Sequence, residues 1–312
     1  MRAGRPRVSI IGAGAVGTAT AHWLAEKSIA DVVLTDIIAG LPEGKALDIQ
    51  QAGPIAGFDV RLSGSSQGYD ETVGSTVVVM TAGVPRKPGM TREQLIETNA
   101  GILRQVIDQV VPRSRDAVFI ILTNPLDAMT YLAYKVSGLP RERVIGQSGA
   151  LDTTRFRTFL AMELGVSARD VDALVIGAHT DKDMVPLASL ASVRGIPVRT
   201  MLSAERLGAV VARTRRGGAE ITELMKQSGF TAAGAALVEM IEAVLLDRRR
   251  VIPCCVYLDG EYGERDLCIG VPVVIGAGGM ERVLEAPLDG AERAAFTASV
   301  AAVRELLAVL KL

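Results

Sequence analysis

The sequence predicts an α/β protein in which a doubly wound parallel sheet is followed by a mixed α+β region. In the first half of the chain, short β-branched runs alternate with helical patterns. Such alternation indicates βαβ units and a parallel sheet. After about residue 146 it gives way to long helical stretches and to paired strand-like runs. We therefore expect one domain over residues 1–146 and a second, substrate-binding or catalytic domain over residues 147–312.

The expected strands of the first half are apolar, β-branched runs that end at turn residues. They occupy residues 8–11, 32–34, 77–80 and 118–122. The expected helices share apolar residues at helical spacing, and the last has a proline in its first turn. They occupy residues 15–27, 92–111 and 125–137.

In the second half of the chain, the sequence predicts longer helices and strands that alternate less often. We expect helices over residues 153–163 and 205–227, with the second one broken at Gly217–Gly218 because glycine pairs weaken helices. A strand is expected over residues 171–176. The remaining elements are two antiparallel strands around a turn and a final amphipathic helix. They occupy residues 251–258, 267–274 and 291–312.

Composition excludes several classes of protein. The 34 basic and 35 acidic residues give a net charge of −1, so nothing predicts binding to nucleic acid or to a membrane surface. No apolar run approaches the ~18 residues of a membrane span, and the basic segment 1–7 is not followed by a signal-like apolar run. Cys254, Cys255 and Cys268 have no metal-site spacing, and their odd number argues against a secreted disulfide framework. We expect a cytoplasmic protein without a metal, with the adjacent cysteines in a buried strand.

A glycine motif opens the chain and predicts a dinucleotide site. It consists of Gly12, Ala13, Gly14, Ala15, Val16 and Gly17. The motif follows an apolar strand and opens a helix, which is the context of a Rossmann-type sheet. There the glycines allow a tight turn, close approach of a pyrophosphate and close helix packing, and the helix N-terminus attracts the phosphates.

Asp36 ends the second expected strand. A carboxylate at this distance from the glycines can accept hydrogen bonds from both ribose hydroxyls, and it would repel a 2′-phosphate. The sequence therefore predicts NAD rather than NADP as the cofactor.

A second group of residues predicts the substrate. Arg86 and Arg92 lie on a loop rich in proline and glycine, Arg155 follows Asp152 by three residues, and His179 is one of only two histidines. A guanidinium group grips a carboxylate bidentately and stays charged at any working pH. Three arginines, one imidazole and one aspartate suit a small substrate with two carboxylates and a reactive carbonyl.

Four motifs make the chain resemble a known family nearly from end to end. They are Ile-Gly-Ala-Gly at 11–14, Ala-Gly-Val-Pro-Arg-Lys-Pro-Gly-Met at 82–90, Thr-Asn-Pro-Leu-Asp at 123–127, and Gly-Gln-Ser-Gly-Ala-Leu-Asp-Thr-Thr-Arg at 146–155. The sequence resembles the lactate/malate dehydrogenase family, and within it the lactate-dehydrogenase-like malate dehydrogenases.

The resemblance implies roles for individual residues. His179 matches the family's catalytic histidine, Asp152 the aspartate that orients it, and Arg155 the arginine that grips the C1 carboxylate. Arg92 matches the arginine that polarises the reacting carbonyl. Imidazolium is also suited on chemical grounds to donate a proton near neutral pH. Arg86 stands where lactate enzymes of the family carry glutamine, and this implies a second substrate carboxylate.

The resemblance also implies contacts with the cofactor and an activity. Beyond the glycine motif and Asp36, the implied contacts are at Asn99, Leu122, Thr123 and Asn124, and Asn124 is also implied to contact the substrate. The implied activity is NAD-dependent, reversible hydride transfer between malate and oxaloacetate, as in the tricarboxylic acid cycle. The family further implies a homo-oligomer, with a tetramer favoured over a dimer.

Two alternatives remain open. One is a dehydrogenase for another 2-hydroxy acid such as lactate, against which Arg86 argues, because an arginine facing a methyl group would leave a buried charge unpaired. The other is a catalytically weak NAD-binding subunit, which is supported only by departures from the family pattern.

The departures fall in two segments. Thr180 replaces the glycine that normally follows the catalytic histidine, and the run from there to Met184 is one residue longer than usual. A β-branched residue would be costly if this position needs a positive φ. The segment 228–234 is one residue shorter than usual. We hypothesise that the gain and the loss compensate each other across the substrate pocket.

Overall fold

A parallel sheet forms the first half of the protein, as the sequence predicts. The computed structural model describes residues 4–85 and 89–310. The parallel strands are β1 (Arg7–Ile11), β2 (Asp31–Thr35), β3 (Leu62–Ser65), β4 (Val77–Met80), β5 (Val118–Ile121) and β6 (Val144–Gly146). Their spatial order is β3-β2-β1-β4-β5-β6. This is the doubly wound order, which reverses direction between β1 and β4.

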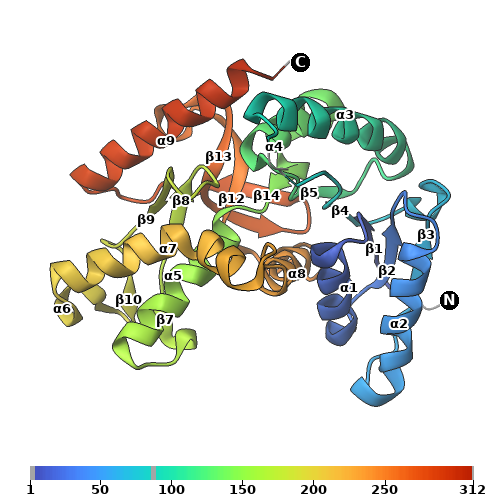
Figure 1. The fold of residues 1–312 in the computed structure, drawn as a ribbon, viewed down its shortest axis with the longest axis horizontal. Coiled ribbons are helices and arrows are strands. Elements are labelled where there is room, and N and C mark those ends of the chain that lie inside the picture. Colours follow the sequence, from blue (N-terminus) through green and yellow to red (C-terminus); the bar gives the residue numbers. More distant parts are fainter. Residues whose placement is uncertain (1–3, 86–88, 311–312) are drawn as a thin grey trace.

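The helices of the first half cover both faces of this sheet (Figure 1). They are α1 (Ala15–Lys27), α2 (Leu41–Ala56), α3 (Arg92–Val110) and α4 (Leu126–Ser137). The predictions of α1, α3 and α4 are confirmed, whereas no sequence pattern predicted α2, β3 or β6. Two prolines and two glycines within α2 obscure its helical pattern, although Pro42 fits the first turn of a helix.

The sheet continues across the predicted domain boundary. Within the described residues it has 11 strands, because β6 pairs with β12 where Gly146 lies opposite Cys255. The added strands are β8 (Val175–Gly177), β9 (Met184–Pro186), β12 (Arg250–Asp259), β13 (Arg265–Gly276) and β14 (Gly279–Val283). The antiparallel pairing of β12 with β13 confirms the two strands predicted around a turn.

The prediction of one strand over residues 171–176 is wrong. This stretch forms β7 (Val171–Asp172) and then β8, which lie in different sheets. A separate small sheet contains β7, β10 (Ser192–Val193) and β11 (Ile196–Pro197). The chain bends away after Asp172, so one apolar run serves two sheets.

The helices of the second half are α5 (Gly149–Leu164), α6 (Val198–Met201), α7 (Ala204–Met225), α8 (Thr231–Leu245) and α9 (Gly290–Ala308). Short 3₁₀ turns occur at Asp70–Thr72, Val111–Arg113, Arg141–Arg143, Ala168–Asp170 and Glu261–Gly263. The predicted break of α7 at Gly217–Gly218 is wrong, since the helix is continuous. A Cβ at Gly217 would come within 3.1 Å of Cδ of Arg155, so the missing side chain admits Arg155.

The buried core has a layer on each face of the sheet. Val8 and Ile10 of β1 pack into the layer that contains residues of α1, α2 and α8, whereas Ile11 packs into the layer of α3 and α4. Alternate residues of a strand point to opposite faces, so the strand serves both layers. The predicted buried strand at Cys254 and Cys255 is confirmed, and both are free thiols. Among the helices described, none is long and apolar enough to cross a membrane.

Candidate active site

The turn between β1 and α1 is shaped by its glycines. Gly12 has a φ of +109°, and a Cβ there would lie 2.7 Å from Oγ1 of Thr81. A Cβ on Gly17 would collide with the carbonyl oxygen of Gly12. No atom within 4 Å would meet a Cβ on Gly14, which is the N-cap of α1. The first and third glycines are therefore required by packing, and the second leaves the helix N-terminus open to an anion.

Asp36 lies directly against this turn. Its Oδ2 accepts the amide hydrogen of Ala13 at 2.8 Å, and its Oδ1 accepts that of Ile38 at 3.0 Å. With Gly12 and Gly14 it lines a cavity of about 360 Å³ at the carboxyl ends of the strands. A groove at this edge, where the strand order reverses, is the position at which doubly wound sheets bind nucleotides.

A second group of predicted residues meets around one carboxylate. Nδ1 of His179 lies 2.7 Å from Oδ2 of Asp152, and Nη1 of Arg155 donates to Oδ1 of the same group at 2.8 Å. Asp152 and Arg155 are one turn apart on α5, and His179 follows β8. The side chain of Asp152 is only 2% exposed. This carboxylate is therefore shared between two cationic groups.

The surroundings of His179 favour its charged form. Burial of the ring lowers the pKa of His179, but the charge and hydrogen bond of Asp152 outweigh burial, so its pKa is raised above the ordinary value. The ring is thus suited to hold a proton at neutral pH and to exchange it. Because Nδ1 is engaged by Asp152, Nε2 is the nitrogen that can face a substrate.

A cavity of about 770 Å³ brings these groups together with residues of the first half. Its lining includes His179 and Arg155 together with Val16, Leu122 and Asn124. Nε of Arg155 is buried and has no hydrogen-bond partner among the described residues. The cavity thus joins the glycine-motif helix, the end of β5 and the charged cluster, and its guanidinium has an unused Nε donor.

Arg92 and Asn99, both predicted site residues, are not among the residues that line this cavity. Arg92 is exposed at the start of α3, and Arg86 lies outside the described residues. Asn99 is buried, and its side chain accepts the amide hydrogen of Val84 at 2.8 Å and donates to the carbonyl oxygen of Asn124 at 2.6 Å. The structure thus gives Asn99 a role in holding the chain beside the cavity, and the roles predicted for these residues stay predictions.

The condition under which Thr180 would be strained is not met. Thr180 has no positive φ, which is found instead at Gly177 (φ +88°). Oγ1 of Thr180 donates to Oδ2 of Asp183 at 2.7 Å and accepts the amide hydrogen of Asp183 at 2.9 Å. The amide of Met184 then closes the turn onto the carbonyl of Thr180 at 3.2 Å. The longer segment is therefore accommodated as a turn that uses the threonine hydroxyl.

Both departing segments line the same cavity. Thr180 and Asp181 of the first segment and Ser228, Gly229 and Ala233 of the second are among its lining residues. The extra residue of the first segment and the missing residue of the second therefore affect the same cavity. That they compensate each other stays a prediction.

Two residues beside His179 were missed by the sequence analysis. Oδ2 of Asp127, on α4, accepts the amide hydrogen of His179 at 3.0 Å, and Oγ of Ser299, on α9, accepts that of Ala178 at 2.8 Å. Asp127 lies within the Thr-Asn-Pro-Leu-Asp motif at 123–127, and an acidic residue in the buried first turn of a helix was a usable signal. Ser299 had no signal, because serines are frequent on helix surfaces.

Comparisons with known proteins agree with this geometry. A model of the lactate/malate dehydrogenase NAD-binding domain matches residues 6–146, and a model of the family's alpha/beta C-terminal domain matches residues 149–311. A malate dehydrogenase of Roseiflexus sp. (strain RS-1) is 54% identical over 98% of this chain and 99% of its own length. That of Bacillus subtilis (strain 168) is 49% identical, with 98% of each chain covered.

Solved structures are similar throughout. A malate dehydrogenase from Salinibacter ruber has a TM-score of 0.93 and 46% identity, with 97% of each chain covered. A lactate dehydrogenase from Cryptosporidium parvum, complexed with lactic acid and nicotinamide adenine dinucleotide, has a TM-score of 0.94 and 38% identity, with 98% of each chain covered.

Proposed function

The chain belongs to the lactate/malate dehydrogenase family, and from this premise we propose that it interconverts malate and oxaloacetate with NAD as cofactor. Full-length relatives at about half identity are malate dehydrogenases. The observation that carries the proposal is the cluster of His179, Asp152 and Arg155 in a cavity that reaches the glycine-motif helix. We keep the predicted division of labour, in which residues 1–146 bind the cofactor and residues 147–312 supply the catalytic groups.

The residues of the first cavity fit NAD. Gly14 leaves open space at the N-terminus of α1, and Asp36 accepts the amide hydrogen of Ala13 in the same turn. Phosphates suit the former and ribose hydroxyls suit the latter. When NAD is bound, the chemistry that it supplies is hydride transfer.

His179 handles the proton of the reaction. In oxaloacetate reduction, protonated His179 donates from Nε2 to the oxygen of the reacting carbonyl, and in malate oxidation the neutral ring accepts the hydroxyl proton. Asp152 holds the proton on Nδ1 and so fixes the orientation of the ring.

The arginines select the substrate. Arg155 lines the cavity and has a buried Nε without a hydrogen-bond partner among the described residues, and it binds the carboxylate next to the reacting carbonyl. By family resemblance, Arg92 polarises that carbonyl and Arg86 binds the second carboxylate. Charge-assisted, bidentate pairs of this kind provide strong discrimination in a closed site.

Steady-state assays with NADH test the proposal. We expect turnover of oxaloacetate to exceed turnover of pyruvate, and Arg86→Gln to shift the ratio of kcat/KM toward pyruvate by several orders of magnitude. Faster turnover of pyruvate by the wild-type protein would contradict the proposed substrate. An unchanged ratio in the variant would contradict the role of Arg86 alone.

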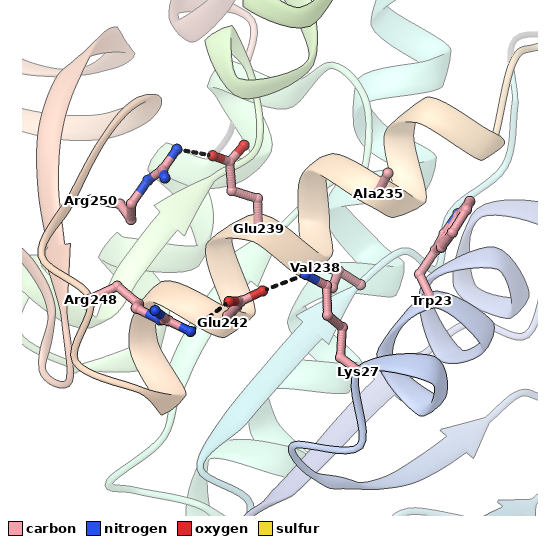
Figure 2. Close-up of a pocket in the computed structure, with 8 residues that line it drawn as sticks. All are labelled: Trp23, Lys27, Ala235, Val238, Glu239, Glu242, Arg248 and Arg250. Carbon is pink, nitrogen blue, oxygen red and sulfur yellow. Dashed lines mark hydrogen bonds and ion pairs between the residues drawn. The ribbon is translucent and has the colours of Figure 1, made fainter. Parts of the chain in front are cut away.

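We further propose a homo-oligomer, with a tetramer favoured over a dimer. Trp23 on α1 is 38% exposed, beside a cavity of about 590 Å³ between α1, α8 and the start of β12 (Figure 2). The charges in this cavity are paired internally, with Lys27 and Arg248 both bound to Glu242. An aromatic residue beside compensated charges suits contact with a second copy. Sedimentation at micromolar protein measures the mass, and a value of about one chain (32.9 kDa) would contradict oligomerisation.

We also propose that the protein acts in the cytoplasm and in the tricarboxylic acid cycle. It is supported by three free, buried cysteines and by the dicarboxylate chemistry of the relatives. Fractionation of the source cells with an oxaloacetate assay would test the location.

A further inference from the structure

The backbone that leads into His179 is held by two buried side chains from different helices. The amide of Ala178 donates to Oγ of Ser299 on α9 at 2.8 Å, and the amide of His179 donates to Oδ2 of Asp127 on α4 at 3.0 Å. Asp127 and Ser299 are each 1% exposed. Two successive amides are thus fixed, one by a neutral acceptor and one by a carboxyl group.

The carboxyl group of Asp127 carries a charge that is not needed merely to accept the backbone hydrogen bond from His179. Burial, the largest influence, raises the pKa of Asp127 to about 6, although the amide and charge of His179 oppose that rise. Its Oδ1 is buried and has no hydrogen-bond partner of ordinary geometry among the described residues. A neutral side chain could accept the same backbone hydrogen bond without a charge to desolvate. A group that is ionised at neutral pH despite this cost points to a use for its charge.

The other charges around His179 indicate what the charge of Asp127 does. Asp152, the counterion of the ring, also binds Arg155, and the positive charge of Arg155 lowers the pKa of His179. The negative charge of Asp127 acts in the opposite direction and raises the pKa of His179. With the ring protonated, two carboxylates then balance two cations. Arg155 neutralises part of the negative charge that Asp152 offers to His179, and the negative charge of Asp127 therefore compensates for that part.

The groups that face Asp127 come from three elements. His179 follows β8, and Cys255 on β12 presents a thiol to the carboxyl group, with Cys268 on β13 next to that thiol. Burial raises the pKa of the Cys255 thiol well above its usual range, so this thiol is neutral at working pH. The negative charge of Asp127 is thus stabilised mainly by the positive charge of His179.

We propose that Asp127 is a positioning residue, which holds the backbone of His179 and supplies the second negative charge that keeps its ring protonated. Asp127 is three residues after Asn124 in the chain, so one short segment reaches both the cavity and the back of the catalytic histidine. The effect on turnover rests on the proposed function, whereas the effect on the protonation of the ring does not.

Histidine NMR tests the charge directly, because His22 and His179 are the only histidines. Protein labelled with ¹³C at the histidine ring gives two titrations, which His22→Gln assigns. In Asp127→Asn, which retains an acceptor but no charge, we expect the His179 midpoint to move to lower pH. Ser299→Ala, which removes a neutral acceptor, is expected to leave the His179 midpoint near that of wild type. An unchanged midpoint in Asp127→Asn overturns the proposal.

Stability and activity together separate this role from a structural one. At pH 8 we expect Asp127→Asn to melt at or above the wild-type temperature, because a buried charge is removed, while kcat for oxaloacetate reduction falls on the order of tenfold. The loss should shrink toward pH 6, where the ring is protonated without help. A lower melting temperature with a loss that does not depend on pH overturns the proposal.

Glu292→Gln is the matched control. Glu292 is a buried carboxylate on α9 that accepts the amide hydrogen of Ser189 at 2.9 Å, away from the residues that line the cavity. Its variant should leave the pH profile of turnover unchanged, and a profile that shifts as in Asp127→Asn overturns the specific role of Asp127. Wild-type protein without oxaloacetate turnover would contradict the proposed function, and the NMR titration would still decide the role of Asp127.

Discussion

The turn at residues 12–17 and the cluster around His179 are built in opposite ways. The turn is one continuous segment, in which backbone and missing side chains form the site. The cluster combines side chains from α4, α5, α9 and the chain after β8, and its atoms meet only in the folded protein. Sterics therefore determine the first region and shared buried charges determine the second.

The two regions should respond differently to substitution. A change in the turn alters packing first and chemistry second, because the Cβ of Gly17 would collide with backbone. A change in the cluster alters the proton affinity of His179 first, because its pKa depends on burial, Asp152, Arg155 and Asp127.

His179→Asn should disable the cluster and spare the turn. We expect kcat to fall by at least about 10²–10⁴, the range for loss of a general acid–base. NADH should still bind, and fluorescence titration measures this. Asp152→Asn should have a smaller effect, because it removes only the orienting partner. Near-normal turnover in the His179 variant would contradict its role as proton donor.

Within the turn, Gly17→Ala should affect the stability of the fold, whereas Gly14→Ala should affect NADH binding. Gly17→Ala must displace the backbone of Gly12, so we expect a loss of stability of roughly 1–3 kcal/mol. Gly14→Ala meets open space and should keep the melting temperature of the ligand-free protein, while NADH affinity falls because the pyrophosphate approaches closely there. Equal melting temperatures for the two variants would contradict this reading.

Asp36→Asn should change the choice of cofactor and little else. The amide can keep one of the two backbone hydrogen bonds that Asp36 accepts, but it no longer repels a 2′-phosphate. We expect the ratio of kcat/KM for NADPH over NADH to rise by about tenfold, the equivalent of about 1.4 kcal/mol. A wild-type protein that already prefers NADPH would contradict the assignment of Asp36.

The pH dependence should separate the two directions of the reaction. The pKa of His179 is raised, so oxaloacetate reduction should stay constant at low pH and decline as pH rises through that value, above the ordinary ~6.5. Malate oxidation should rise through the same value. The contribution of His179 to stability is complete below the unfolded pKa and is lost as pH rises through the folded one. Profiles of kcat/KM and melting temperatures across pH 5–9 would check both signs.

Much of the fold was predictable from local patterns. The strands at 7–11, 77–80 and 118–121 and the helix at 15–27 agree with their predicted spans to within a residue. Each has a clear apolar run or a helical period with turn residues at its ends. In contrast, α2 and β3 escaped prediction, because glycine and proline in one and small polar residues in the other leave no such period.

The candidate site was predictable in part and for a different reason. Asp152, Arg155 and Asn124 lie in motifs and His179 was identified by family resemblance, and the structure brings His179, Asp152 and Arg155 together around one carboxylate. The break at Gly217–Gly218 was predicted wrongly, because glycine propensity carries no information about the Arg155 side chain that packs there.

The sequence by itself determined the parallel sheet, the glycine turn and the identity of the charged residues, because each depends on neighbours a few positions apart. Only the tertiary structure decided that Asp127 and Ser299 hold the amides before the His179 ring, across sequence separations of 52 and 121 residues. It also decided that Thr180 forms a turn without strain. Burial and charge sharing act through space, so no local pattern encodes the proton affinity of His179.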